Sequence, residues 1–331
     1  MKKILLIGTG GTIASKKTTT GLTPAMLSDE ILEYVPSIKQ LCEVKTEQIF
    51  NIDSTNMTTM HWIRIAEHVR DNYDFYDGFV ILHGTDTMAY TAAALSYLIQ
   101  GSKKPVVLTG SQKPIDVDIS DAKVNLMDSF LYACDENSHG VSIIFGGQAI
   151  AGTRARKTRT KSYNAFSSID FPAKAVIQDK KLIRYITNDF YLEKPEFYTK
   201  LNTKVFVLKL IPGIDSHIFA YLKEHYNVIV IESFGVGGLP MYDNDVFADA
   251  LEDWVKSGKT IIMTTQVPHE GSDMATYRVG FKIKEKCELI EAYNMTLEAV
   301  VTKVMWILGQ TDNQDEIRKM FYEPVNYDIF I

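Results

Sequence analysis

A glycine-rich loop near the N-terminus presents a threonine that could do chemistry. The loop, Thr9-Gly10-Gly11-Thr12, directly follows an apolar run, and adjacent glycines let a backbone adopt positive φ angles and approach a ligand closely. Three interpretations compete: a tight structural turn, a dinucleotide-binding loop, or a loop that presents Thr12 as a nucleophile. The dinucleotide interpretation is weak, because Ile13 occupies the place of the third glycine of that motif.

A second loop, His83-Gly84-Thr85-Asp86-Thr87, stands between an apolar run and an expected helix. The N-terminus of a helix carries free N–H groups and partial positive charge, which favours anions and oxyanions. This loop could therefore bind an anion or an oxyanion, or Asp86 or Thr87 could serve only to cap the helix. His83 and Asp86 could also form a metal pair. Because no third ligand is nearby, we expect His83 to be a hydrogen-bonded histidine at a strand end.

Two further segments carry reactive residue types. Arg154–Lys161 has five cations in eight residues, which could bind nucleic acid, form a solvated basic strand or loop, or turn one lysine inward to activate a hydroxyl. Asn51–Met57 is a cluster of small polar residues that could be a loop with a helix cap, or could supply hydroxyl and amide groups to an amino-acid carboxylate. No GxSxG, HExxH or cysteine-protease signature occurs, so a hydrolase with this sequence would have to use threonine.

Short apolar strands alternate with amphipathic helices along the whole chain. Consecutive Val- and Ile-rich positions are typical of parallel strands covered on both faces, and the alternation predicts an α/β fold with two doubly wound, mainly parallel sheets. The expected strands are 3–8, 78–83, 105–109, 141–145, 204–210, 227–232 and 260–264. The expected helices are 59–73, 87–100, 121–133 and an apolar stripe at 297–308 that Gly309 should end.

Composition and length bound the kind of protein. The chain has 331 residues, 46% hydrophobic and 23% charged, with net charge −6, which excludes a disordered chain and argues against general nucleic-acid binding. Three widely spaced cysteines, Cys42, Cys134 and Cys287, argue against a disulfide framework or zinc site and are typical of a cytosolic protein. No apolar run is long enough to span a membrane.

The strand–helix alternation weakens between residues 179 and 202, where charged and aromatic residues follow no clear period. We therefore predict an N-terminal catalytic domain at 1–185, a linker at 186–203 and a C-terminal α/β domain at 204–331. The larger first domain contains the unusual loops and should carry the active site.

Together these segments resemble the bacterial L-asparaginase family, specifically its cytoplasmic type I branch. TGGTIAS at 9–15 and HGTDTMAYTAAALS at 83–96 match the two family signatures. Weaker family stretches are matched by TGSQKP at 109–114, SDA at 120–122 with Asn125, and ESFGVGG at 232–238. The resemblance runs from the first strand to the last helix and implies an amidohydrolase that converts L-asparagine to L-aspartate and ammonia.

The resemblance implies a role for each matching residue. Thr12 would be the nucleophile that forms a covalent β-aspartyl ester, and Thr85, Asp86 and Lys157 would form the family's Thr–Lys–Asp set. Ser54 would hold the substrate α-carboxylate and Asp86 the α-ammonium group. The candidate substrate-binding residues are Asp53, Ser54, Thr55, Thr85 and Asp86.

The resemblance also implies the substrates and partners. No cofactor or metal is required, and L-glutamine should be a poorer substrate because its extra methylene misplaces the amide relative to Thr12. The family forms dimers or tetramers, so we expect a homodimer or homotetramer in which loops 235–238 and 266–277 contribute to the sites. We expect no nucleic-acid or membrane partner and a cytoplasmic location.

The chain departs from the family pattern in the segment Lys16–Pro24 and in the second domain. Many members have a tyrosine in the lid, whereas Leu22 stands at the corresponding place, which leaves the proton carrier for Thr12 open. The polar segment should still be able to close over a substrate. Some type I enzymes are activated by asparagine through an arginine and a cysteine that Glu232 and Val267 replace here, so we expect weak or no activation of this kind.

Three other functions are weighed against this one. An asparaginase-like subunit of an archaeal-type amidotransferase resembles this chain but carries an added N-terminal domain, whereas this sequence starts at the first strand. A non-catalytic amino-acid or nucleotide sensor fits the fold but would not need Thr12, Thr85, Asp86 and Lys157 together. A dehydrogenase would show a thermal shift with NAD.

Overall fold

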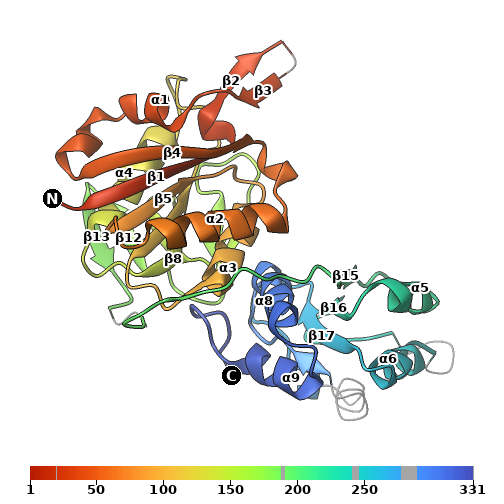
Figure 1. Cartoon of the computed structure of the whole chain (residues 1–331). Coiled ribbons are helices and arrows are strands. Elements are labelled where there is room, and N and C mark those ends of the chain that lie inside the picture. Colours follow the sequence, from red (N-terminus) through yellow and green to blue (C-terminus); the bar gives the residue numbers. More distant parts are fainter. Residues whose placement is uncertain (20, 188–190, 241–245, 277–288, 331) are drawn as a thin grey trace. The chain divides into compact units, whose positions relative to one another are not determined.

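The computed structural model describes residues 1–19, 21–187, 191–240, 246–276 and 289–330. The chain forms two compact units, Met1–Thr199 and Lys200–Ile331 (Figure 1). The division falls inside the segment expected to be a linker, because strand β14 (Glu196–Phe197) pairs with β6 (Ile99–Gln100) and so belongs to the first unit. The first unit therefore extends past residue 185.

The first unit contains an eight-stranded sheet in the order β13-β12-β9-β8-β7-β5-β1-β4. Its parallel part consists of β4 (Glu43–Ile52), β1 (Lys3–Gly10), β5 (Gly78–Leu82), β7 (Pro105–Thr109) and β8 (Gly140–Phe145). Strands β5 and β7 are buried at every position, as expected of strands covered on both faces. The predicted parallel strands of this unit are confirmed, and β4 is added at one edge.

The other edge of the sheet is antiparallel, which the sequence pattern does not indicate. Strand β8 turns back into β9 (Gln148–Ala151) through Gly146 and Gly147, whose φ angles of 57° and 74° suit a two-residue hairpin. Strand β9 then pairs with β12 (Ala175–Gln178), which forms a second hairpin with β13 (Lys181–Arg184). The sheet is thus mainly parallel, as predicted, with a three-stranded antiparallel edge.

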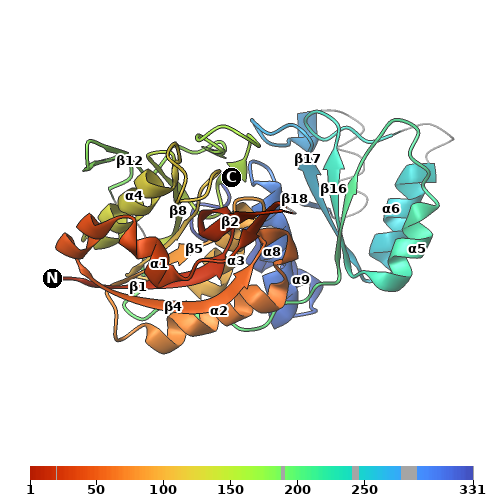
Figure 2. The same ribbon diagram turned by 90° about the horizontal axis from the view of Figure 1, so that it is seen from above.

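Helices cover both faces of this sheet (Figures 1 and 2). Helices α1 (Ser28–Glu33) and α4 (Ala122–Cys134) pack on one face, and α2 (Thr59–Asn72) and α3 (Met88–Leu98) lie on the other. The core beneath α1 and α4 includes Ile4, Leu6, Ile31, Leu126 and Phe130.

The shorter elements of both units are η1 (Thr12–Ala14), β2 (Ser15–Thr18), β3 (Gly21–Pro24), η2 (Pro36–Gln40), η3 (Ser54–Asn56), β10 (Ala155–Lys157), β11 (Phe166–Ser168) and η4 (Met274–Thr276).

The second unit has a four-stranded, all-parallel sheet in the order β15-β16-β17-β18. The strands are β15 (Val205–Lys209), β16 (Val228–Ser233), β17 (Thr260–Thr265) and β18 (Ile290–Glu291). Its helices are α5 (Ile218–His225), α6 (Val246–Lys256), α8 (Leu297–Gln310) and α9 (Gln314–Tyr322). Helices α5 and α6 lie on one face of the sheet and α8 and α9 on the other (Figure 2), which confirms the predicted α/β class.

The end of helix α8 differs from the sequence-based expectation. Gly309 was expected to stop the helix, but α8 continues through it to Gln310. A β-carbon at Gly309 would overlap the carbonyl oxygen of Lys200, and the Gln310 Nε2 donates a hydrogen bond to that same oxygen at 3.2 Å. The glycine is therefore required because the helix packs closely against the backbone of Lys200, and not because a turn ends the helix there.

Two expectations about the chain can be compared with the described residues. No helix in the described ranges combines the length and apolar character needed to cross a membrane. Cys42 and Cys134 are free thiols, whereas Cys287, and Tyr277 at the end of loop 266–277, lie outside the described residues.

Candidate active site

The candidate residues lie in loops at the carboxyl ends of neighbouring strands. Strands β4, β1 and β5 are adjacent and parallel, so the loops that follow them emerge at the same edge of the sheet, where ligands bind in open α/β sheets. A β-carbon added to Gly84 would lie 2.6 Å from Ser54 Oγ and 3.3 Å from Gly11 Cα. The structure therefore brings together the segments that carry Thr12, Ser54 and Thr85.

Gly11 is the point where the first loop meets its neighbours. Its φ angle is +84°, and a β-carbon there would overlap the backbone of Gly84. The Gly11 N–H donates to the carbonyl oxygen of Ile52 at 3.1 Å. Thr12 follows as the first residue of η1, and it is partly exposed. The glycine thus fixes where the chain enters the short helix that carries the Thr12 hydroxyl.

A lysine from a distant hairpin joins the second loop. Lys157 is the last residue of β10, which pairs with β11, and its Nζ donates to Thr85 Oγ1 at 2.8 Å and to Asp86 Oδ1 at 2.6 Å. The Lys157 side chain is only 16% exposed, while that of Asp86 is 59% exposed. One lysine of the basic segment therefore turns inward, and it connects a hydroxyl with a carboxylate that stays open to solvent.

The third loop is held rigidly beside the second. Asp53 caps η3 by accepting hydrogen bonds from the Thr55 N–H at 2.9 Å and from the Thr55 hydroxyl at 2.8 Å. Thr87, which precedes α3, donates its hydroxyl to the Ser54 carbonyl oxygen at 2.8 Å. Ser54 itself is buried against Gly84. Asp53 and Thr55 are thus hydrogen-bonded to each other, while Ser54 faces the loop that carries Thr85 and Asp86.

His83 is a buried structural residue, as the sequence predicts. Its Nδ1 lies 2.7 Å from the Gly84 carbonyl oxygen, so Nδ1 carries the proton, and its Nε2 accepts from the Thr91 hydroxyl at 2.9 Å. Trp62 Nε1 in turn donates to Thr91 Oγ1. Burial lowers the pKa of His83 to about 4. In the described part of the chain no cluster of three or more His, Cys, Asp or Glu could hold a metal ion.

The buried neutral His83 should make the fold sensitive to acid. An unfolded histidine has a pKa near 6.5 and the folded one about 4, so below about pH 6.5 the unfolded state binds the proton first. The contribution of His83 to the free energy of unfolding is complete above about pH 6.5 and should fall by about 3 kcal/mol as the pH drops towards 4. Urea unfolding of the wild type and of His83→Asn from pH 7 to pH 4.5 measures it. A steeper acid loss in the wild type is expected, and equal slopes would contradict it.

Gln112 is a site residue that the residue types alone did not single out. Thr85 donates its hydroxyl to Gln112 Oε1 at 3.3 Å. The Asp121 carboxylate accepts from the backbone N–H groups of Gln112 and Lys113 and from the Asn125 side chain. Burial raises the pKa of Asp121, although these hydrogen bonds favour its charged form. The signal in the sequence was the pair of weaker stretches at 109–114 and 120–122, which the structure joins.

The sequence matches established models of two protein domains. Residues 3–189 match the asparaginase N-terminal domain, and residues 204–321 match the glutaminase/asparaginase C-terminal domain. The chain belongs to the asparaginase family. It is therefore an asparaginase-family amidohydrolase, and the resemblance found in its two signature loops is confirmed.

Individual members of the asparaginase family are similar over nearly the whole chain. An L-asparaginase of Thermococcus kodakarensis is 37% identical over 99% of both chains, and the solved thermostable L-asparaginase of that organism superposes with a TM-score of 0.94 over 99% of both chains. L-asparaginase I of Vibrio cholerae has a TM-score of 0.90 at 27% identity, over 100% of this chain and 99% of its own. A glutamyl-tRNA(Gln) amidotransferase subunit of Pyrococcus abyssi is 36% identical over 97% of this chain and 75% of its own length.

Substitution of Gly11 should damage both the fold and the site of this asparaginase-family enzyme. Gly11→Ala would have to adopt a left-handed backbone and displace Gly84, so we expect a loss of about 3 kcal/mol or more in the free energy of unfolding. Gly213→Ala is the matched control, because Gly213 has a φ of +79° but nothing within 4 Å of an added β-carbon. It should cost only about 1–2 kcal/mol. Equal losses in the two variants would show that the contact with Gly84 is unimportant.

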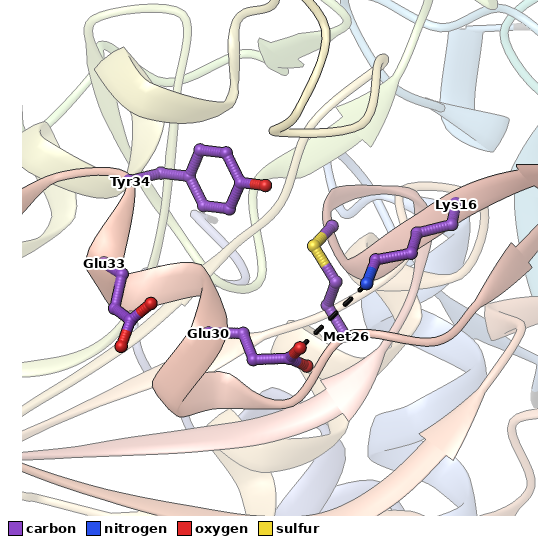
Figure 3. A pocket seen from close by; sticks show the side chains of 5 residues that line it. All are labelled: Lys16, Met26, Glu30, Glu33 and Tyr34. Carbon is purple, nitrogen blue, oxygen red and sulfur yellow. Dashed lines mark ion pairs between the residues drawn. The ribbon is translucent and has the colours of Figure 1, made fainter.

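The segment expected to act as a lid forms a hairpin of β2 and β3 directly after η1. Nζ of Lys16, in β2, lies 4.0 Å from Oε1 of Glu30, in α1. Both side chains are 50% exposed, so this ion pair contributes little to stability. The side chain of Leu22 lies outside the described residues. A cavity of about 340 Å³ opens between the hairpin and α1 (Figure 3); its lining residues are Lys16, Met26, Glu30, Glu33 and Tyr34.

The two positions linked to asparagine activation lie in the second unit. Glu232 is buried near the end of β16, and its carbonyl oxygen accepts a hydrogen bond from Gln266 Nε2 at 3.0 Å. Val267 is 46% exposed. A buried carboxylate and a valine do not reproduce the chemistry of an arginine and a cysteine, so weak or absent activation by asparagine stays a prediction.

Proposed function

We propose that this protein is an L-asparaginase that hydrolyses the side-chain amide of L-asparagine to L-aspartate and ammonia through Thr12. The single observation that supports this most strongly is the contact of Lys157 with both Thr85 and Asp86. Lys157 is about 70 positions away from Thr85 in the sequence, yet the two side chains meet next to the contact between Gly11 and Gly84. The pairwise identity to an L-asparaginase over the whole chain supports the same assignment.

The reaction proceeds as two acyl transfers. The Thr12 oxygen bonds to the side-chain carbonyl carbon of asparagine, the carbon–nitrogen bond breaks, and the hydroxyl proton leaves with the nitrogen as ammonia. Water then attacks the β-aspartyl ester, releases L-aspartate and returns a proton to Thr12. Backbone N–H groups of the loops at the sheet edge and at the start of α3 can stabilise the oxyanion of each tetrahedral intermediate.

The other site residues fit the two charged groups of the substrate and the proton transfers. Asp86 is exposed and can pair with the α-ammonium group, while Ser54 can bind the α-carboxylate. Thr85, hydrogen-bonded to the Lys157 ammonium, is placed to accept a hydrogen bond from the reacting hydroxyl or water. Asp53 and Thr55 act through each other to hold the loop of Ser54 in place.

The proposal extends to partners and location. No cofactor is needed for these steps. L-Glutamine should react more slowly, since the extra methylene shifts its amide away from Thr12. We propose a homodimer or homotetramer that is located in the cytoplasm. The location is supported by a similar structure from Campylobacter jejuni, which is described as a probable cytoplasmic L-asparaginase and has a TM-score of 0.81 at 27% identity.

Ammonia release by the purified chain tests the proposed function. The protein alone should release ammonia from L-asparagine, with no added metal or cofactor, and more slowly from L-glutamine. Equimolar aspartate should form, measured by an independent assay. A folded preparation that releases no ammonia from asparagine would refute the proposal.

A second candidate is favoured by one observation. Glutamyl-tRNA(Gln) amidotransferase subunits from Pyrococcus abyssi and Metallosphaera sedula are 36% and 34% identical to this chain, close to the value for the L-asparaginase. An amidotransferase subunit would deliver its ammonia to a partner that holds a tRNA-bound acid. Turnover that appears only with a co-purified partner and tRNA would support this alternative, and full turnover by the isolated chain would refute it.

A further inference from the structure

The Thr85 hydroxyl makes two hydrogen bonds of opposite sense. Its oxygen accepts from Lys157 Nζ at 2.8 Å, and its proton is donated to Gln112 Oε1 at 3.3 Å. A hydroxyl has one proton and two acceptor lone pairs. With the proton directed at Gln112 and one lone pair at Lys157, one lone pair remains, and it can only accept.

The Gln112 amide is held in the orientation that makes it an acceptor for Thr85. Its Nε2 donates to the carbonyl oxygen of Ser162 at 3.2 Å. If the amide were flipped, Oε1 would face the Ser162 carbonyl and Nε2 would face Thr85, so two acceptors would oppose each other. Ser162 therefore determines which end of Gln112 meets the threonine.

The backbone of Gln112 is fixed as well. Its N–H donates to both carboxylate oxygens of Asp121, at 3.1 and 2.9 Å. Asn125 Nδ2 donates to Asp121 Oδ2 at 3.2 Å and to the Gly110 carbonyl oxygen at 3.0 Å. Asn125 Oδ1 accepts from the Gly146 N–H, at the end of β8. Gln112 is thus connected to the sheet and to helix α4, so its backbone position is fixed independently of Thr85.

We propose that Gln112 is a positioning residue that fixes the direction of the Thr85 proton, so that Thr85 presents a lone pair, and not a proton, to the group that reacts in the site. This inference rests on the proposed function. Lys157 meanwhile keeps its own protons directed at Thr85 and Asp86. A Thr85 hydroxyl free to rotate would spend part of its time with the proton facing the reacting water or the Thr12 hydroxyl, where it cannot accept theirs.

Two substitutions separate proton direction from packing. Gln112→Met keeps the size of the side chain but removes the acceptor, and kcat for asparagine should fall roughly tenfold with KM little changed. Gln112→Glu keeps an acceptor for the Thr85 proton whether its carboxyl is ionised or protonated. Its kcat should therefore stay well above that of Gln112→Met, without the roughly tenfold loss.

The controls make each outcome decisive. Gln178→Met, at an exposed position at the end of β12, should leave kcat and the melting temperature unchanged. If Gln112→Met matches the wild type, or if folded Gln112→Glu loses as much kcat as Gln112→Met, Gln112 does not direct the proton. Where Gln112→Met fails to fold, Gln112→Glu alone decides, because a roughly tenfold loss of kcat in that variant would refute the acceptor role. A wild type that releases no ammonia refutes the proposed function and this inference together, whereas an active wild type with an equally active Gln112→Met refutes this inference alone.

Discussion

Thr12→Ala should abolish ammonia release from L-asparagine while the protein stays folded. Removal of the hydroxyl leaves no oxygen to form the β-aspartyl ester, so we expect kcat to fall by at least roughly 10³-fold. Thr12 is partly exposed at the start of a short helix, so the free energy of unfolding should change by no more than about 0.5 kcal/mol. A coupled ammonia assay and a thermal melt on the same preparation measure both quantities.

Thr12→Ser is the matched control for this substitution. Serine keeps the hydroxyl and removes only a methyl group, so this variant should retain much of the activity that alanine loses. The assignment of the nucleophile would be contradicted by substantial turnover in Thr12→Ala. It would also be contradicted if serine and alanine were equally inactive in folded protein, since the loss would then follow the methyl group and not the oxygen.

Lys157→Met should produce the second large loss of activity. The substitution removes the ammonium group that donates to Thr85 and Asp86, and with it the charge that supports proton transfer at the Thr85 hydroxyl. We expect kcat to fall by roughly 10²–10⁴-fold. The loss should appear in kcat more than in KM, because Asp86 is exposed and remains available to the substrate ammonium group. Steady-state kinetics with asparagine separate the two terms.

Two lysine controls accompany this variant. Lys161→Met changes an exposed lysine of the same basic segment and should leave kcat unaltered. Lys157→Arg keeps the positive charge, but its planar guanidinium cannot place one compact donor between two acceptors, so only partial activity should return. A Lys157→Met variant with wild-type kcat would remove Lys157 from the mechanism.

The central strands and helices could be predicted because burial on both faces leaves a clear pattern. Strands β5 and β7 are apolar at nearly every position, and the structure places them within one residue of the expected bounds. Strand β4 was missed, because it lies at the sheet edge and none of its residues is fully buried. The antiparallel edge was missed for a different reason: its order depends on hairpin turns such as Gly146–Gly147, which the alternation pattern does not record.

The site was predictable in its parts but not in its contacts. Gly11 was singled out as a loop glycine, and the structure shows why glycine is needed both there and at Gly84, which is that the two loops touch each other. The inward turn of Lys157 could not be deduced from its basic neighbours, because it depends on the pairing of β10 with β11; the family resemblance supplied that position. Gln112 lies in the family stretch at 109–114, but no residue spacing connects it with Thr85, and that connection is seen only as a hydrogen bond in the structure.

The most direct test of the account is capture of the covalent intermediate. Wild-type enzyme mixed with L-asparagine and quenched in acid should contain one added aspartyl group, and peptide mass analysis should locate it on Thr12. The signal should be absent from Thr12→Ala under the same conditions. An aspartyl group on Thr85, or steady ammonia release with no covalent adduct at any time after mixing, would contradict the account.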